Sequence, residues 1–198
     1  MRCKLCKKQG VYKCSVCGRT VCNEHARLRT NCPSCITKTK IDYTICRVKS
    51  ETEKTTIRRL VKQFWGETEQ LTFDRTFDVA ELSAYVAKAH DGIVGFISFA
   101  EDKDSLIVVA MAVKPKYQGS GVGKSLIRKV EAEARKTGKK TLRVSTSNDD
   151  LPALAFYQST GFRIYEIKPN AIAEKHGEIL SGISGLLIKD EIRLRKAL

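Results

Sequence analysis

The sequence predicts an α+β domain that follows a small metal-binding module. From residue 42 onward, apolar residues recur with helical and strand periods in alternation. Seven of the eight cysteines lie in the first 35 residues, where they form regular pairs. The chain has 198 residues and is 42% apolar, enough for one ordinary core and a small second unit. We therefore expect a zinc-binding module over residues 1–38 and the α+β domain over residues 42–198.

The N-terminal module offers eight metal ligands in four pairs. Three pairs have the spacing C-x-x-C and one has C-x-x-H, which lets one tight turn present both side chains to a tetrahedral ion. The pairs are Cys3/Cys6, Cys14/Cys17, Cys22/His25 and Cys32/Cys35. Eight ligands predict two closed structural Zn²⁺ sites, and metal binding would supply the folding energy of so short a segment. Such sites leave no position for a catalytic water.

The spacing alone allows either sequential or alternate pairs to share an ion. The run "YKCSVCGRTVCNEH" resembles the HIT-type and B-box zinc fingers, which use cross-braced, alternate pairing. The resemblance implies one zinc on Cys3, Cys6, Cys22 and His25, and the other on Cys14, Cys17, Cys32 and Cys35. Cys46 is left over and is expected to be a small core residue.

The positive charge is concentrated in the same module. The formal net charge is +14, and residues 1–40 hold ten Lys or Arg against one acid. A surplus of this kind favours an acidic partner, with nucleic acid the leading candidate, although a solvated basic face is the alternative. No apolar run approaches the roughly 20 residues that span a bilayer, and the N-terminus lacks a signal-like apolar segment. We expect a cytoplasmic protein that does not enter membranes.

The first elements of the larger domain follow from local signals. Alternation over residues 42–50 predicts a strand. Ser50 and Glu53 have capping-box spacing at the start of a helix that Gly66 ends. Residues 83–100 predict two strands around the Asp91-Gly92 turn, a strong hairpin signal.

The later elements continue the alternation. The apolar run 104–113 predicts a buried strand, and a glycine-rich turn leads from it into a helix over residues 121–138. A strand over residues 140–147, a short helix over 151–160 and a strand over 162–167 follow. The order of strand, helix, hairpin, strand, helix, strand, helix and strand is typical of an α+β layout.

The glycine-rich turn resembles a nucleotide-binding loop but lacks its spacing. A phosphate loop that ended at "GKS" would need glycine where Gln118 stands, and Gly119, Gly121 and Gly123 alternate, which also excludes G-x-G-x-x-G. A strand, a short glycine turn and a helix start still present free backbone N–H groups to an anion. We expect the three glycines to keep side chains away from that anion.

The order of elements and two motifs resemble the GCN5-related N-acetyltransferases (GNAT) over about residues 42–198. Gln118 to Gly123 fit the Arg/Gln-x-x-Gly-x-Gly/Ala signature of that superfamily, and "TSNDDLPALAFYQSTGF" fits its second hallmark. The resemblance implies a mixed, mostly antiparallel sheet flanked by helices, and acetyl-CoA as cosubstrate. It implies that the anion is the pyrophosphate of coenzyme A. The cosubstrate-binding residues expected from it are Met111, Ala112, Val113, Gln118, Gly119, Ser120, Gly121, Val122, Gly123, Lys124 and Asn148.

The resemblance also implies the chemistry, in which an amine attacks the thioester directly. Tyr157 matches the acid that protonates the departing thiolate, and Asn148 matches a residue that binds the cosubstrate arm or a water. The central strand offers no acid, so Glu67 after the first helix is the candidate base, with a solvent-facing loop acid as the alternative. The function expected is an N-acetyltransferase whose basic finger docks an amine-bearing protein or RNA acceptor, in preference to a small molecule. The alternative is a binding protein that keeps the fold without turnover.

Overall fold

The structure, a computed structural model, describes residues 2–4, 6–10, 12–13, 20–21, 41–182 and 185–198. Six predicted zinc ligands lie outside the described residues: Cys14, Cys17, Cys22, His25, Cys32 and Cys35. In the described N-terminal part, Lys7 N–H donates to the carbonyl of Cys3 at 3.0 Å, and β1 (Tyr12–Lys13) pairs antiparallel with β2 (Thr20–Val21). Among the described residues, no three or more His, Cys, Asp or Glu side chains gather as a metal site.

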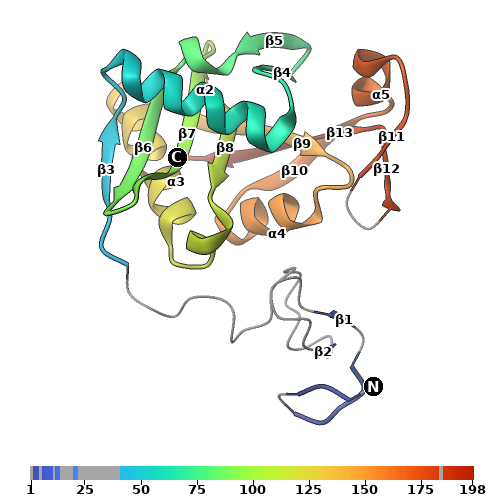
Figure 1. Cartoon of the computed structure of the whole chain (residues 1–198). Coiled ribbons are helices and arrows are strands. Elements are labelled where there is room, and N and C mark those ends of the chain that lie inside the picture. Colours follow the sequence, from blue (N-terminus) through green and yellow to red (C-terminus); the bar gives the residue numbers. More distant parts are fainter. Residues whose placement is uncertain (1, 5, 11, 14–19, 22–40, 183–184) are drawn as a thin grey trace.

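A seven-stranded sheet in the order β10-β13-β9-β8-β7-β6-β3 forms the centre of the domain (Figure 1). Neighbouring strands are antiparallel except for β8 and β9, which run parallel. The mixed, mostly antiparallel sheet is therefore confirmed. The strands are β3 (Thr44–Arg47), β6 (Ser83–Ala89), β7 (Gly92–Glu101), β8 (Ser105–Val113), β9 (Thr141–Ser147), β10 (Arg163–Lys168) and β13 (Glu191–Ala197).

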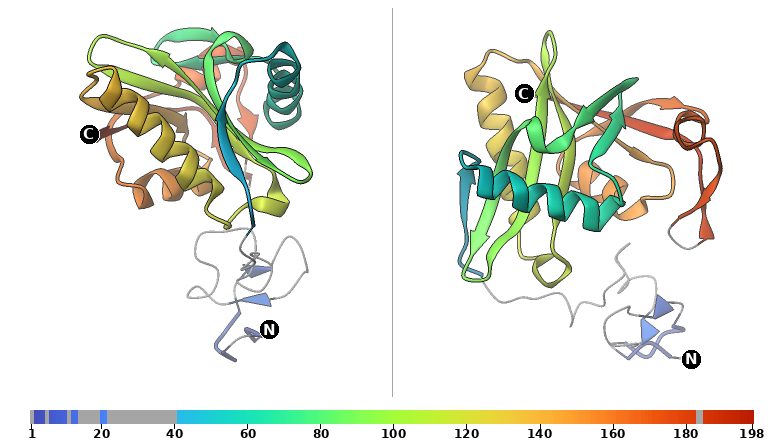
Figure 2. Two further views of the ribbon diagram at one scale, coloured as in Figure 1. Left: turned by 90° about the vertical axis from the view of Figure 1, so that its left-hand side faces the viewer. Right: turned by 45° about the horizontal axis from the view of Figure 1, so that its top comes forward.

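Helices cover both faces of the sheet, as the left view of Figure 2 shows for α2 and α3. The helix α2 (Glu51–Trp65) buries Ile57, Leu60 and Val61 against side chains of β6, β7 and β8. On the opposite face, α3 (Val122–Lys136) and α4 (Leu151–Ser159) pack on the larger apolar core. Within the described part of the chain, every helix is too short or too polar to cross a lipid bilayer.

The structure confirms the predicted start and end of α2 and the predicted turn between β6 and β7. The Ser50 side chain accepts from the backbone N–H of Glu53 at 3.3 Å, and the Glu53 carboxylate accepts from Ser50 N–H at 3.2 Å. Both bonds satisfy donors that the first turn of α2 leaves unpaired. Gly66 ends the helix with φ of 79°, and Gly92 completes the β6–β7 turn with φ of 85°.

The parallel strands β8 and β9 stay paired over only part of their length. Ser105–Val108 pairs with Thr141–Val144, and the register then stops, while β8 remains paired with β7 as far as Val113. An irregularity between Ser98 and Phe99 of β7 interrupts the β7–β8 register at the same level. A bulge bends and twists a strand. We infer that it directs the second half of β8 away from β9, so that the sheet opens between them.

Several elements were not predicted from the sequence. They are the hairpin of β4 (Glu69–Thr72) and β5 (Arg75–Asp78), the short helix α5 (Ala171–His176), the strands β11 (Leu180–Ser181) and β12 (Leu187–Ile188), and β13. The expected strand over residues 162–167 exists as β10, but β13 lies between it and β9. The connection between β10 and β13, residues 169–190, therefore carries α5, β11 and β12.

Buried charges hold the β4–β5 hairpin against the sheet. Glu191, 2% exposed, accepts from the backbone N–H of Phe73 at 2.9 Å and from Nε of Arg193 at 2.9 Å. The guanidinium groups of Arg143 and Arg193 lie 4.1 and 5.1 Å from the ring centre of Phe73. Nη2 of Arg193 lies within ion-pair distance of Glu191 and Asp74, but at angles that do not make a hydrogen bond. The stability of the hairpin thus depends on Glu191.

Glu191→Ala is expected to lower the free energy of unfolding by roughly 2–3 kcal/mol, because it leaves Nε of Arg193 and the buried N–H of Phe73 without their acceptor, while Glu166 and Asp74 still compensate the guanidinium charge. Urea unfolding followed by circular dichroism measures this loss. The control is Glu101→Ala, whose carboxylate is 70% exposed and lies 3.4 Å from Lys139. That change should cost less than about 1 kcal/mol. Equal, small losses in both variants would contradict the role of Glu191.

Candidate functional site

The glycine turn brings an uncapped helix start to the open part of the sheet. Gly121, with φ of 94°, precedes α3 and provides no side-chain cap. The first helical bond runs from Ser125 N–H to the carbonyl of Gly121 at 3.0 Å. Among the described residues, no acceptor is found for the N–H groups of Val122, Gly123 and Lys124. Three such donors at the positive end of a helix dipole form an anion site, and Lys124 adds a charge.

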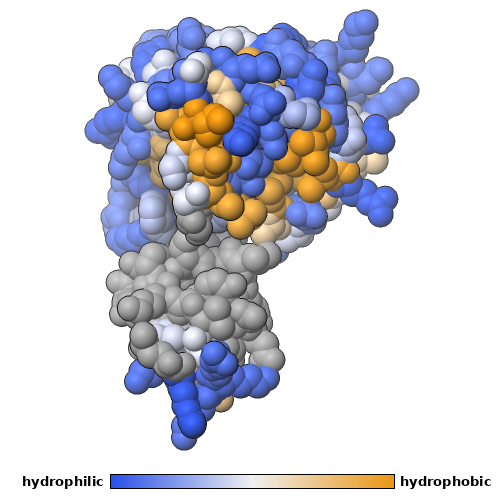
Figure 3. Space-filling model, turned by 90° about the vertical axis from the view of Figure 1, so that its right-hand side faces the viewer, coloured by the Kyte–Doolittle hydropathy of each residue, from blue (hydrophilic) through white to orange (hydrophobic). Residues whose placement is uncertain are grey.

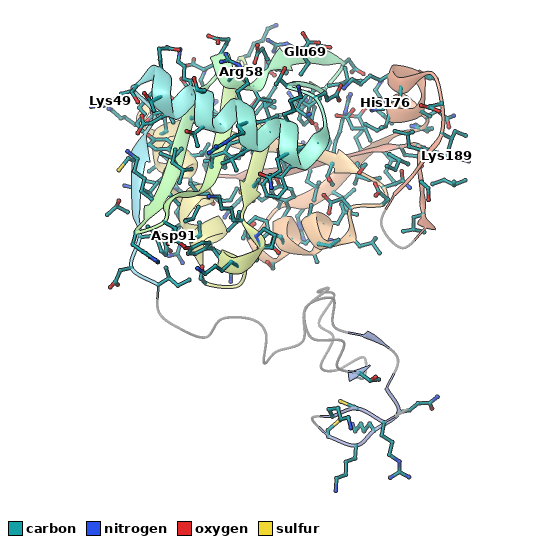
Figure 4. All side chains as sticks on the ribbon, viewed as in Figure 1. Lys49, Arg58, Glu69, Asp91, His176 and Lys189 are labelled. Carbon is teal, nitrogen blue, oxygen red and sulfur yellow. The ribbon has the colours of Figure 1, made fainter. Side chains whose placement is uncertain are left out.

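The side chains of the turn hold its shape. Gln118 Nε2 donates to the carbonyl of Val113 at 3.0 Å, and Ser120 Oγ donates to the carbonyl of Tyr117 at 2.6 Å. The hydroxyl of Tyr117 in turn donates to Asp91 in the β6–β7 turn, which Figure 4 labels at this end of the sheet. The backbone N–H groups, not these side chains, are therefore the donors that the turn leaves open.

Positions 121 and 123 of the turn require glycine for different physical reasons. At Gly121 the positive φ disfavours any L side chain, whereas a Cβ on Gly123 would lie 3.2 Å from two atoms of the Phe156 ring. The absence of a side chain at Gly123 thus allows α4 to pack closely on α3. The sequence pattern predicts that the glycines keep side chains away from an anion. At Gly123 the structure adds a second reason, which is the packing of α4.

The strand β8 presents an unpaired edge beside this helix start. Beyond Val108, no described strand pairs with it on the β9 side, although the Val113 carbonyl accepts from Gln118 Nε2. The predicted residues Met111 and Val113 are partly exposed there, while Ala112 is 8% exposed and packs toward α2. Backbone groups on an open edge can pair with an extended ligand as they would with another strand.

Tyr157 lies on α4 with a buried ring and an unpaired hydroxyl. The ring packs edge-on against Phe156 and Phe162, and the residue is 5% exposed. Its hydroxyl makes no hydrogen bond with the described residues. Burial, and then the charge of Asp150, raise the pKa of Tyr157 well above its usual range.

Asn148, at the end of β9, has its side chain engaged within the protein. Its Nδ2 donates to the carbonyl of Leu187 at 2.9 Å, and its Oδ1 accepts from the N–H groups of Lys189 and Asp190 at 2.9 Å each. Asn148 thus fastens the 169–190 connection to the end of β9, a role that sequence reasoning missed. A contact of Asn148 with the cosubstrate arm stays a prediction.

Glu67 follows α2 and forms an ion pair with the same connection. Its Oε1 lies 2.5 Å from Nζ of Lys175 on α5, with side chains 39% and 21% exposed. Lys175 and Asn148 therefore attach the 169–190 connection to the end of α2 and to the end of β9. The histidines His90 and His176 are exposed. Figure 4 labels His176 on α5, far from the glycine turn.

Exposed apolar side chains gather on the face that carries the 169–190 connection (Figure 3). On that connection, Ile179, Leu180, Leu186 and Leu187 are 37–52% exposed, and Phe64 and Trp65 at the end of α2 are 38% and 40% exposed. Phe64 shares a helical face with the buried Ile57, Leu60 and Val61, yet it is exposed in the last turn of α2. These side chains make the surface formed by the 169–190 connection and the end of α2 apolar.

Comparisons with known proteins agree with this geometry. The model of the acetyltransferase (GNAT) family matches residues 52–162. The chain is 30% identical over 141 residues to the uncharacterized protein YdhI of Bacillus subtilis, covering 68% of this chain and 86% of YdhI. It is also 30% identical over 111 residues to the uncharacterized N-acetyltransferase YvbK of B. subtilis, covering 56% of this chain and 71% of YvbK.

Solved structures show the same fold. An IAA acetyltransferase from Bacillus cereus superposes with a TM-score of 0.63 at 26% identity, covering 79% of this chain and all of the other. A GNAT family acetyltransferase from Elizabethkingia anophelis with acetyl-CoA bound superposes with a TM-score of 0.59 at 23% identity, covering 79% of this chain and 98% of the other.

Proposed function

Because the chain belongs to the GNAT family and is an acetyl-CoA-dependent N-acetyltransferase, we propose how its own residues carry out the transfer. The open N–H groups of Val122, Gly123 and Lys124 bind the pyrophosphate of acetyl-CoA. The unpaired edge of β8 at Met111 to Val113 pairs with the pantetheine arm. The observation that carries the proposal is the position of three unpaired N–H groups beside that open edge.

The fit of coenzyme A to this site rests on charge and on hydrogen-bonding capacity. A diphosphate needs several donors and a positive potential, and α3 has no acidic residue in its first turn. Met111 to Val113 offer backbone donors and acceptors to the amide groups of an extended arm, apart from the Val113 carbonyl, which Gln118 already holds. Acetyl-CoA, when bound, supplies an acetyl group activated as a thioester.

In the proposed reaction, the acceptor nitrogen bonds to the acetyl carbon as the carbon–sulfur bond breaks. Tyr157 donates its phenolic proton to the departing sulfur and is reprotonated from solvent. Glu67 accepts the proton that the acceptor nitrogen loses, for which it must release Lys175. The phenol of Tyr157 is protonated at neutral pH, as an ordinary tyrosine is, which is the form that an acid needs; burial raises its pKa further.

Tyr157→Phe is expected to lower kcat by about 10²–10⁴-fold, because it removes a general acid and keeps the ring. Affinity for acetyl-CoA and the melting temperature should change little, since no cavity forms. Acetyl-CoA hydrolysis, or transfer to an amine found by screening, provides the rate. Tyr165→Phe is the control, because the Tyr165 hydroxyl only accepts from Arg143 on the sheet. A fully active Tyr157→Phe enzyme would remove the proposed acid and leave the fold assignment unchanged.

Glu67→Gln is expected to lower kcat by about 10²-fold or more with an unchanged KM for acetyl-CoA, because the amide cannot accept the proton. The control is Glu69→Gln, an exposed acid two residues further along the chain. Lys175→Met removes the competing cation and should preserve activity. Steady-state rates across the three variants decide the matter. If Glu67→Gln and Glu69→Gln behave alike, Glu67 is a loop acid and not the base.

We also propose that residues 1–38 form a two-zinc module that docks a macromolecular acceptor, protein or RNA. The support is the regular spacing of four ligand pairs and the +9 charge of residues 1–40. A tight turn holds this segment: Lys7 N–H donates to the Cys3 carbonyl at 3.0 Å, and Cys3 N–H donates to the Lys8 carbonyl at 2.7 Å. Such a turn suits a C-x-x-C pair.

Two equivalents of zinc per chain are expected in the purified protein, because eight ligands complete two tetrahedral sites. Elemental analysis measures the content. Cys14→Ser should lose zinc and reduce acetylation of whole-cell protein or RNA, while acetyl-CoA binding by the larger domain persists. Cys46→Ser is the control, since Cys46 lies on β3 outside the predicted ligand set. One equivalent or none in the unsubstituted protein would reject the two-site arrangement.

A further inference from the structure

The segment that leads into β3 is attached to the first turn of α3. The hydroxyl of Tyr43 lies 2.8 Å from Oγ of Ser125, a contact between residues 82 positions apart. Ile41, Tyr43 and Ile45 also pack against the larger apolar core. The main chain at residues 41–45 therefore has a defined position beside the helix start and continues into β3, the edge strand of the sheet.

Tyr43 also lies beside Gly121, the residue that precedes α3. A Cβ built on Gly121 would be 3.7 Å from the Tyr43 hydroxyl oxygen. Gly121 and Ser125 are four residues apart, so they lie one above the other on the same side of the first turn. The hydroxyl therefore lies along the turn whose N–H groups at Val122, Gly123 and Lys124 have no acceptor among the described residues.

The hydrogen bond between the hydroxyls of Tyr43 and Ser125 can leave one of the two protons available to a third group. Either oxygen can be the donor in the contact between Tyr43 and Ser125. When Ser125 donates, the Tyr43 O–H is free to donate to a third group, and its direction is limited by the bond it accepts. An anion at the start of α3 is the acceptor that the surroundings favour, because the first turn holds Lys124 and no acid.

We propose that Tyr43 is a further cosubstrate-binding residue whose hydroxyl, oriented by Ser125, donates to the diphosphate bound at the start of α3. The inference rests on the proposed binding of pyrophosphate by Val122, Gly123 and Lys124. It makes the segment that joins residues 1–40 to the acetyltransferase domain part of the cosubstrate site. By linkage, cosubstrate binding and the seating of residues 41–43 then favour one another.

The test is calorimetric binding of coenzyme A to the full-length chain and to three variants. Tyr43→Phe should weaken binding by about 10–100-fold, the value of a hydrogen bond to a charged group. Ser125→Ala should weaken it by only a few fold, because the Tyr43 hydroxyl remains but is less well directed. Tyr85→Phe is the matched control, since it removes a hydroxyl that donates to Glu133, near the other end of α3, at 3.0 Å.

A ligand without phosphate shows whether Tyr43→Phe weakens binding by removing a contact with the diphosphate or by loosening α3 in general. Pantetheine, measured by competition, should bind Tyr43→Phe and the unsubstituted protein equally. Hydrogen exchange of residues 41–45 should slow on addition of coenzyme A in the unsubstituted protein, and slow less in Tyr43→Phe.

Three results would overturn the inference: unchanged coenzyme A affinity in Tyr43→Phe, an equal loss in Tyr85→Phe, or an equal loss of pantetheine binding. Failure of the unsubstituted protein to bind coenzyme A would refute the proposed function, and the inference with it.

Discussion

The parting of β8 from β9 is the constraint on which the rest of the site depends. A buried backbone group without a partner costs free energy, so strands in a sheet interior rarely separate. Here the two central strands part after Val108 and Val144, at the level where the β7–β8 register is interrupted. The result is a strand edge inside the domain that an extended ligand can complete. Acetyl-CoA, with its amide-bearing arm, has the hydrogen-bonding groups to do so.

The two ends of the proposed reaction path are linked by one packing contact. Gly123 lies in the helix turn that offers N–H groups to a diphosphate, and the ring of Phe156 occupies the space that a side chain at 123 would need. Phe156 is the neighbour of Tyr157, and their rings contact each other edge-on. A glycine that serves helix packing therefore also sets the distance between the anion site and the phenol. A side chain at position 123 would therefore disturb both the helix start and the packing beside Tyr157.

The 169–190 connection is held in place by segments that are distant from it in the chain. Asn148 holds residues 187–190 at the end of β9, and Lys175 reaches Glu67 at the end of α2. The apolar side chains of this face are exposed because no described element covers them. None of these contacts involves the glycine turn before α3, so the 169–190 connection is fastened independently of that turn.

The sequence by itself determined the local elements of this protein. The capping box of Ser50 and Glu53, the Asp91-Gly92 turn, the glycine turn before α3 and the periods of α2 and α3 are encoded in neighbouring residues, so local preference sufficed. Tertiary structure alone decided that β13 lies between β9 and β10, that Asn148 fastens a distant segment, and that Tyr43 meets Ser125. These contacts join residues tens of positions apart, and one sequence carries no local signal for which distant partner satisfies a given donor.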